Sequence, residues 1–215
     1  YPGVIMPMME KQIAMYPPVY NKPRMMVRLY NVSDHSAPKM AREIKFDGSA
    51  VSSRKIQDKI YLVLQQPMVW NYPMPLGVTE DALMPKFEDS AVKLRGDQPV
   101  ARCGAVSILP HHMAPEYITV ATIPLTGTVQ EVKREVVVGS AQNIYASLEN
   151  LYVAKTEWQY HWDARGSESS ENTHVYRFDF TDDGVDFKAQ GKVPGRILNQ
   201  FSMDEHESTF RIATT

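Results

Sequence analysis

The feature that most constrains this chain is a glycine-led segment that the sequence repeats. Residues 48–64 read GSAVSSRKIQDKIYLVL and residues 139–156 read GSAQNIYASLENLYVAKT, so that Tyr61 and Tyr152 follow their glycines at the same spacing. Residues 195–215 begin with a glycine again and match if the turn is longer. Each segment predicts a turn glycine, a strand, a polar turn and a second strand with an aromatic residue. Repetition of this kind decides the architecture, so we expect several copies of one unit.

The sequence between these segments adds a second pair of strands to each unit. Short runs of aliphatic and aromatic residues bounded by turn residues predict these strands. Three such pairs occur, at residues 25–32 with 41–46, 118–125 with 132–138, and 174–180 with 187–193. We call the strands after the glycine A and B, and the following pair C and D. Four-stranded units that repeat in one chain indicate a β-propeller, and a sandwich or an open stack of hairpins is the alternative.

The fold class that we predict is all-β, as a β-propeller fragment of four-stranded antiparallel blades with long B–C loops. Two complete blades would be flanked by half-blades within a single propeller domain. The expected parts are a loop at residues 1–24, a C–D half-blade at 25–48, a blade at 49–138 with an insertion at 65–117, a blade at 139–194, and an A–B half-blade at 195–215. Because so few blades close a ring poorly, we expect the open strand edges to pair with other copies of the chain.

Composition limits the class of partner. The chain of 215 residues is 43% hydrophobic, which suffices for a core. Its formal net charge of −2 argues against nucleic acid as a partner. No apolar run reaches the ~20 residues that span a membrane. Cys103 is the single cysteine, which excludes an internal disulfide. The chain begins at Tyr1 without a signal pattern, and we expect it to be a piece of a longer protein.

Three segments carry a resemblance to a known family: VSSRKIQDKIYLV, GSAQNIYASLENLYVAKT and VPGRILNQFSMDEHESTFRIATT. They resemble secreted bacterial and archaeal proteins with a C-terminal β-propeller domain that is distantly related to WD-type repeats. The last segment is the most specific, because generic strand composition does not explain its run LNQFSMDE. The resemblance covers most of residues 25–215 apart from the insertions. It implies an extracytoplasmic protein, secreted or associated with the cell envelope, in a family without an established activity and with a longer propeller than this chain holds.

The large aromatic residues gather on one face of the predicted propeller. B–C loops leave a propeller on one face, and this chain has its longest connections there, at residues 1–24, 65–117 and 156–173. Exposed aromatics dominate the energetics of interfaces, so this face is predicted to bind a protein or a glycan. The alternative is that these side chains form small local cores for the loops. The candidate ligand-binding residues are Trp70, Tyr72, Trp158, Tyr160 and Trp162.

Two other functions stay open beside a non-catalytic binding or scaffold module without a cofactor. The side chains of His111, His112 and Met113 suit copper, so a metal-handling protein with Met- and His-rich loops is one alternative. A hydrolase or lyase that uses a propeller face is the other. The sequence contains no G-x-S-x-G, H-E-x-x-H or phosphate-binding glycine loop, and an enzyme is therefore less expected. Arg54, on an A strand, is predicted either to line a central channel or to pair with an acidic neighbour.

Overall fold

The computed structural model describes most of the chain. The described residues are 23–68, 79, 83–92, 96–108, 116–126, 131–139, 141–163, 166–182 and 184–215. Strands dominate, and the two short 3₁₀ helices are η1 (Cys103–Ala105) and η2 (Gln200–Ser202). Within these ranges, no helix has the length and the apolar composition needed to cross a membrane.

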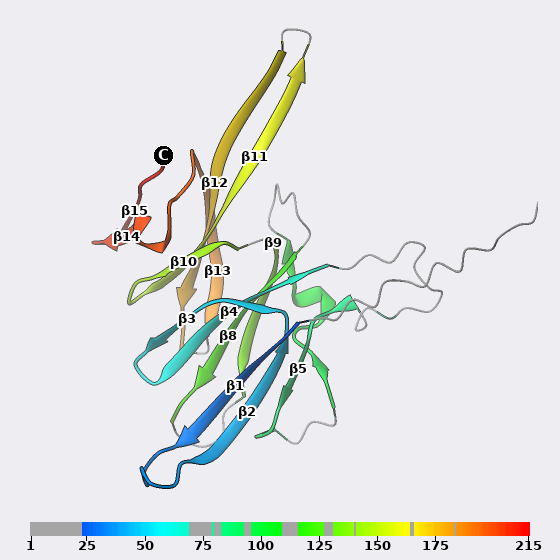
Figure 1. Ribbon diagram of the computed structural model, residues 1–215, viewed down its shortest axis with the longest axis vertical. Helices are drawn as coiled ribbons and strands as arrows, with labels where there is room; N and C mark the ends of the chain where they lie inside the picture. The colour runs from blue at the N-terminus through cyan, green and yellow to red at the C-terminus, as the bar shows by residue number, and fades with distance from the viewer. Residues whose placement is uncertain are drawn as a thin grey trace, which may run out of the picture.

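The strands of the described residues form four sheets (Figure 1). Sheet I contains β1 (Arg24–Asn31), β2 (Lys39–Asp47), β5 (Lys86–Asp89) and β6 (Gln98–Pro99). Sheet II contains β3 (Ser49–Ile56), β4 (Lys59–Pro67), β8 (Glu116–Pro124), β9 (Lys133–Gly139) and β7 (Ser107–Ile108). Sheet III contains β10 (Asn143–Ala146), β11 (Asn150–Asp163), β12 (Gly166–Phe180) and β13 (Val185–Pro194). Sheet IV contains β14 (Met203–His206) and β15 (Thr209–Ile212).

Sheets II and III are the two complete blades of the predicted propeller fragment. In each of them the A, B, C and D strands pair antiparallel with their neighbours, in the orders β3-β4-β8-β9 and β10-β11-β12-β13. Sheets I and IV flank these blades and begin from the predicted half-blade strands, β1-β2 and β14-β15. The all-β fold class is therefore confirmed, and the sheets do not close into a ring.

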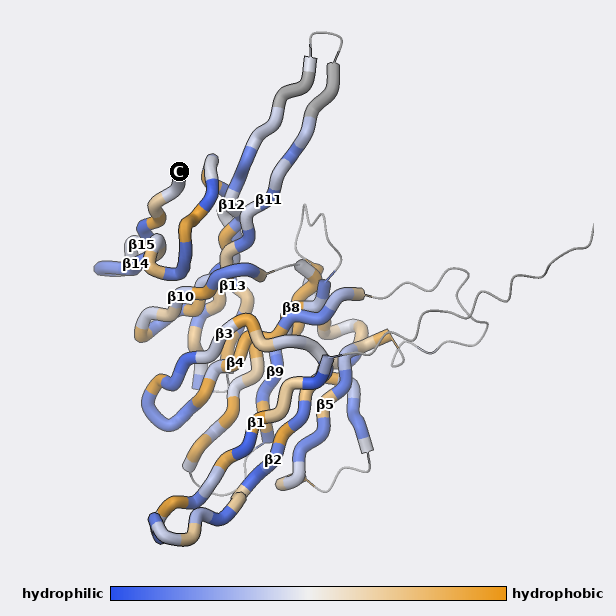
Figure 2. The backbone as a smooth tube through the Cα atoms, viewed as in Figure 1, coloured by the Kyte–Doolittle hydropathy of each residue, from blue (hydrophilic) through white to orange (hydrophobic). Residues whose placement is uncertain are grey.

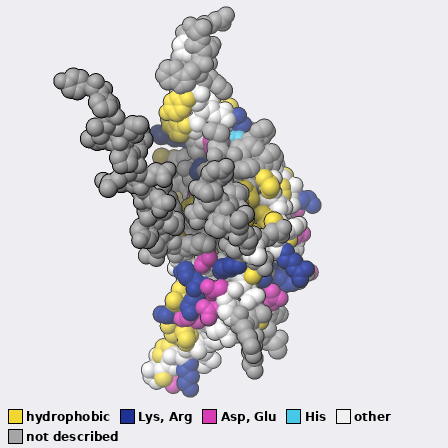
Figure 3. Space-filling model, turned by 90° about the vertical axis from the view of Figure 1, so that its right-hand side faces the viewer, with side chains coloured by type: hydrophobic (Ala, Val, Ile, Leu, Met, Phe, Trp, Pro, Cys, Tyr) yellow, Lys and Arg dark blue, Asp and Glu magenta, His cyan; other side chains and the backbone are white. Residues whose placement is uncertain are grey.

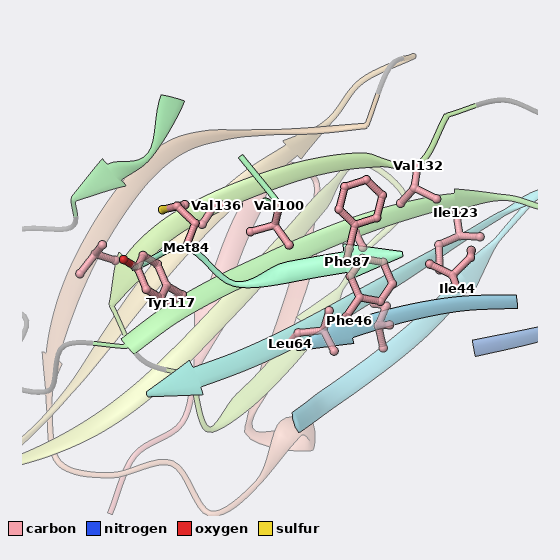
Figure 4. Packing of buried hydrophobic residues seen from close by; sticks show 13 residues of the cluster. Ile44, Phe46, Leu64, Met84, Phe87, Val100, Tyr117, Ile123, Val132 and Val136 are labelled. Atoms are coloured by element: carbon pink, nitrogen blue, oxygen red, sulfur yellow. The ribbon is translucent and has the colours of Figure 1, made fainter. Parts of the chain in front are cut away.

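Stacked sheets explain why β8 is buried along almost its whole length. Alternate residues of a strand point to opposite faces, and both faces of sheet II are covered. One face, with Leu62, Leu64 and Ile123, packs on Ile44 and Phe46 of sheet I (Figure 4). The other face packs on sheet III through Tyr61, Val63, Ile118, Leu151, Val153, Tyr176 and Phe178. Figure 2 shows the hydrophobic segments concentrated where these sheets meet.

Sheet IV covers the far face of sheet III. Tyr152 stacks on Phe210 with ring centroids 4.1 Å apart, and Ile197 and Met203 complete this third cluster. The chain reaches sheet IV through Gly195, whose φ is +83°. A Cβ atom there would lie 2.6 Å from the carbonyl oxygen of Thr215, so only glycine fits. Gly48 at the first repeat has φ +107° and faces the carbonyl oxygen of Gln65 at 2.8 Å, which gives the repeated glycine the same structural reason.

The insertion between β4 and β8 differs from its prediction. We expected a long B–C loop at residues 65–117, whereas residues 86–89 form strand β5, which extends sheet I beyond β2. Phe87 is 2% exposed and inserts into the core between sheets I and II, which favours a strand that alternates buried and half-buried residues. Strand β6 then pairs with β5, and β7 pairs in parallel with β9.

The prediction of a loop at residues 156–173 is also wrong, because most of these residues belong to strands. Strands β11 and β12 pair without interruption from Asn150 opposite Asp179 to Asp163 opposite Gly166. Strand β10 flanks β11 only as far as Ala154, and β13 flanks β12 only as far as Asn172. We call the two-stranded part beyond these flanks, residues 156–163 and 166–171, the arm. Figure 1 shows the arm projecting from sheet III. Its strands form because bulky and polar residues alternate at 157–162, which is the period of a strand.

Candidate ligand-binding site

The arm presents two large aromatic side chains on one face. Trp158 is 51% exposed and Tyr160 is 66% exposed. Residues two apart on a strand point to the same side and lie about 7 Å apart along it, so these side chains are neighbours. Across the hairpin, Trp158 lies opposite Glu171 and Tyr160 lies opposite Ser169. The result is an aromatic strip with polar residues beside it, which we call the aromatic face.

Exposed hydrophobic side chains are visible on the projecting end of the molecule in Figure 3. The aromatic face continues the side of sheet III that sheet IV covers. Tyr152 and Ala154, which pack under sheet IV, point to the same side of β11 as Trp158 because alternate residues of a strand share a face. The segment that leads to sheet IV contacts sheet III near the base of the arm, where the N–H of Gly195 donates to the carbonyl oxygen of Glu171 at 2.7 Å. The aromatic face is thus the uncovered continuation of a packed surface.

Hydrogen bonds fix the base of the arm. The N–H of Thr156 donates to Oε1 of Gln142 at 2.9 Å, and the hydroxyls of Thr156 and Thr173 lie 3.1 Å apart. The hydroxyl of Thr173 also donates to the carbonyl oxygen of Gly195 at 2.7 Å. These bonds join the arm to a neighbouring strand and to the segment that leads to sheet IV. The arm therefore leaves the blade in a set direction.

Buried ionisable groups lie beside these bonds on the opposite face. Nε2 of His174 lies 3.5 Å from Oε2 of Glu157, and both residues are buried. Burial, with a smaller contribution from the negative charge of Glu157, raises the pKa of the Tyr176 hydroxyl to about 12. Tyr176 is 2% exposed and belongs to the core between sheets II and III. The base of the arm is part of the fold, in contrast to its aromatic face.

The structure brings together two of the five predicted ligand-binding residues, Trp158 and Tyr160. Trp162 occupies the next position of the same parity on β11, and its side chain lies outside the described part. The other two, Trp70 and Tyr72, lie outside the described residues, as do the predicted metal ligands His111, His112 and Met113. In the portions of the chain that the structure describes, no group of three or more His, Cys, Asp or Glu side chains could hold a metal ion.

The described part of the long insertion follows the alternative that was open for it, a local core. Met84, Phe87 and Val100 are each 2% exposed and pack in the cluster between sheets I and II. The guanidinium carbon of Arg134 lies 3.9 Å from the centre of the Phe87 ring, and Nε of Arg134 donates to the carbonyl oxygen of Val100 at 2.9 Å. These side chains therefore stabilise the fold.

A pocket lies at the end of β11 that is opposite to the arm, where the sequence predicted only short polar turns. Arg54 lines it together with Tyr145, Glu205 and Glu207. Of the two predictions for Arg54, pairing with an acidic neighbour is wrong, since its hydrogen bonds go to neutral groups. A signal was available, because Arg54 and Tyr145 stand at the same position after their repeat glycines.

Comparison with known proteins gives one match. A family model described as a beta propeller domain matches residues 5–215, nearly the whole chain. No curated protein and no solved structure shows significant similarity to the chain. The match agrees with the stacked four-stranded sheets of the structure.

Proposed function

The chain belongs to the β-propeller domain family, and from that premise we propose that it is a non-catalytic, extracytoplasmic module that binds an extended polypeptide along the arm. The observation that carries the proposal is the exposure of Trp158 and Tyr160 side by side on a projecting hairpin. A rigid scaffold that presents a variable element is the usual arrangement of a recognition surface. Aromatic side chains favour contact rather than proton transfer, which supports a binding role.

Exposed aromatics are expected to contribute most of the binding free energy. Tyrosine and tryptophan are the residues most enriched among interface positions whose truncation costs about 2 kcal/mol or more. They also lose little conformational entropy on binding, because each has two side-chain torsions. The fixed base of the arm adds to this, since a pre-oriented surface loses less freedom when a ligand binds.

The open edge of β11 supports a polypeptide as the ligand. Strand β10 stops pairing at Ala154, and the N–H of Thr156 is taken by Gln142. By strand alternation, the N–H groups of Trp158 and Tyr160 face the same side, where no described strand pairs with β11. An extended peptide can add to such an edge through main-chain hydrogen bonds, with alternate side chains reading the neighbouring surface. A glycan would use the aromatic rings but not the open strand edge.

The test is a screen of the protein against an array of extended 12-residue peptides and against a glycan array, followed by titration of the best peptides. We expect peptides to bind, and Trp158→Ala with Tyr160→Ala to weaken them at least tenfold. Gln159→Ala, on the other face of the same strand, is the matched control and should bind as the unmodified protein does. Binding of glycans alone, or unchanged peptide affinity in the double variant, would contradict the proposal.

The extracytoplasmic setting rests on the resemblance of residues 25–215 to exported proteins. An antibody against this domain tests it on cell fractions of the source organism. We expect the protein in the culture fluid or the envelope fraction. Recovery with a cytoplasmic marker would overturn this part of the proposal and leave the binding site untouched.

Self-association is proposed from the open edges of the flanking sheets. In the described chain, β1 pairs only with β2, and β15 pairs only with β14. These are a C-type and a B-type strand, which are adjacent in a complete blade, so β15 of one copy can pair with β1 of another. Light scattering after size-exclusion chromatography should show a dimer or larger species. Met26→Pro should shift it to the monomer, because Met26 is exposed on β1 and its N–H faces away from β2 by strand alternation. A monomer at all concentrations would contradict the pairing.

A further inference from the structure

A pocket of about 540 Å³ opens where the A–B turns of three successive units meet. It lies beyond the end of β11 that is farthest from the arm, so it is separate from the aromatic face. Its walls come from the end of β3, from β10 with the turn after it, and from β14 with its turn. The volume falls within the range of small-molecule sites, about 300–1,000 Å³. The lining residues used below are Arg54, Lys55, Tyr145, Glu149, Glu205 and Glu207.

One wall holds the guanidinium group of Arg54, which has no carboxylate partner within the described chain. Nη1 of Arg54 donates to Oγ of Ser52 at 3.0 Å and to the carbonyl oxygen of Ser53 at 2.8 Å, and Nη2 donates to Oε1 of Gln200. These three acceptors are neutral, and Nε of Arg54 donates to no described residue. Lys55 is the next residue on β3, so its side chain points to the other face of the strand, where Nζ donates to the carbonyl oxygen of Gln57 at 2.7 Å.

Other arginines of the chain are paired differently. Arg24 lies 2.7 Å from Oδ1 of Asp97, Arg42 lies 2.6 Å from Oδ2 of Asp89, and Arg177 lies 2.8 Å from Oδ1 of Asp179. A guanidinium group matches the geometry of a carboxylate, and such charge-assisted bonds are the stronger ones. Arg54 is held in place by neutral groups and keeps that capacity for a ligand.

The facing wall is acidic. Glu205 is positioned by Nδ2 of Asn150, which donates to its Oε1 at 2.7 Å, and its own N–H donates to the hydroxyl of Tyr145 at 3.1 Å. Glu149 lines the pocket from the turn after β10, and Glu207 lines it from the turn after β14. These carboxylates would repel a phosphate or another multiply charged anion. They attract a cationic group that enters beside Arg54.

We propose that this pocket binds a small zwitterion, with its carboxylate at Arg54 and its ammonium group at the glutamates. Ile56, Ala146 and Leu148 supply apolar contacts for the carbon atoms between the two charges. A free amino acid and a short peptide with free ends share this chemistry. The volume accommodates either, so the experiment must separate them.

The test is calorimetric titration of the folded protein with leucine and with trileucine, each compared with its amidated form and its N-acetylated form. We expect one of the two unmodified zwitterions to bind, and both capped forms of that ligand to bind at least tenfold more weakly. If leucine binds more tightly, the source is a free amino acid, and if trileucine does, it is a peptide with free ends. No binding of either, or equal binding of a capped form, would overturn the proposal.

Variants locate the site. Arg54→Gln should weaken the zwitterion at least tenfold, and Glu207→Gln, on an exposed turn that tolerates the change, should weaken it by a smaller factor. Arg28→Gln, which removes a surface ion pair on β1, is the matched control and should have no effect. Trp158→Ala with Tyr160→Ala should also leave this binding unchanged, which separates it from the proposed polypeptide site. Unchanged binding in both Arg54→Gln and Glu207→Gln would contradict the assignment.

Discussion

Two connections at the same place in successive blades have opposite fates. Each joins a B strand to a C strand, one between β4 and β8 and the other between β11 and β12. The described part of the first folds back on the body, where Phe87 is 2% exposed. The second extends away from the body and leaves Trp158 51% exposed. The comparison teaches that a connection at the B–C position can also complete the core, as the described part of the first one does, whereas the second presents aromatic side chains.

The difference comes from what each connection finds beside it. Strand β5 of the first pairs with β2 of the preceding sheet and brings Asp89 to Arg42. Nε and Nη2 of Arg42 donate to the two carboxylate oxygens of Asp89 at 3.0 and 2.6 Å. In the described chain, no third strand pairs with the arm beyond Thr156 and Asn172. Removing side chains should therefore cost stability in the first connection and little in the second.

The largest expected effect is that of Phe87→Ala. The ring of Phe87 stacks on Phe46 with centroids 6.2 Å apart and lies under Arg134, so truncation leaves a cavity in the core. We expect the free energy of unfolding to fall by about 4 kcal/mol, measured by urea denaturation. A loss of less than ~1 kcal/mol would show that the insertion is not part of the core.

Asp89→Asn is expected to cost slightly less. The substitution keeps the shape of the side chain but removes the charge that faces the buried Arg42, whose pair has exposures of 7% and 0%. A loss of about 3 kcal/mol in urea is expected, because breaking a buried ion pair leaves one charge poorly compensated. The control is Glu88→Gln at the residue before Asp89, which weakens a more exposed ion pair with Lys45. It should change the free energy of unfolding by less than ~0.5 kcal/mol. Equal effects of the two substitutions would contradict the role of Asp89.

The burial of Tyr176 near the base of the arm should make the stability of the protein depend on pH in alkaline solution. The pKa of Tyr176 is raised to about 12 in the fold, whereas an unfolded tyrosine titrates near about 10. Between pH ~10 and ~12 the folded chain therefore keeps the phenol proton that the unfolded chain loses. The contribution of neutral Tyr176 to the free energy of unfolding is complete below pH ~10. It is lost as the pH rises toward about 12, by up to ~2 kcal/mol.

Tyr176→Phe tests this titration. The variant should lose stability less steeply than the unmodified protein between pH ~10 and ~12 when urea midpoints are compared. Tyr152, whose pKa burial also raises to about 12, contributes a similar slope that the variant retains. Parallel pH curves for the two proteins would show that the base of the arm is open to water.

The smallest expected effect belongs to the aromatic face itself. Trp158→Ala and Tyr160→Ala each remove a side chain that is more than half exposed, so the free energy of unfolding should change by less than ~0.5 kcal/mol. The same urea experiment measures it. A loss comparable with that of Phe87→Ala would mean that these rings pack in the folded protein and are not free for a ligand.

The strands of the repeat were predictable because their signals are local. The glycines, the polar turns and the alternating residues of 48–64 and 139–156 recur at one spacing. The backbone geometry explains two of the repeat glycines, Gly48 and Gly195. The pairing of β5 with β2 was not predictable, since it depends on two segments that are far apart in sequence. The pocket was missed for a similar reason, because three distant turns form it.

The arm was a different kind of error. The alternation of Trp158, Tyr160 and Trp162 with polar residues was readable, but the polar composition of residues 166–172 favoured a loop. A two-stranded hairpin without flanking strands needs a firm anchor, and the bonds at Thr156 and Thr173 supply it. That anchor joins segments that no local pattern connects, so the aromatic residues were placed on the correct element only by the structure.

One measurement tests the central claim most directly, which is that the arm serves contact and not folding. A variant in which Asn-Gly replaces residues 160–169 joins the facing residues Gln159 and Ser170 by a tight turn, and Trp158→Ala removes the remaining ring. Titration with array-selected peptides should show that binding is lost, while the urea midpoint stays within the equivalent of ~0.5 kcal/mol. A shortened protein that still binds those peptides, or that no longer folds, would contradict the account.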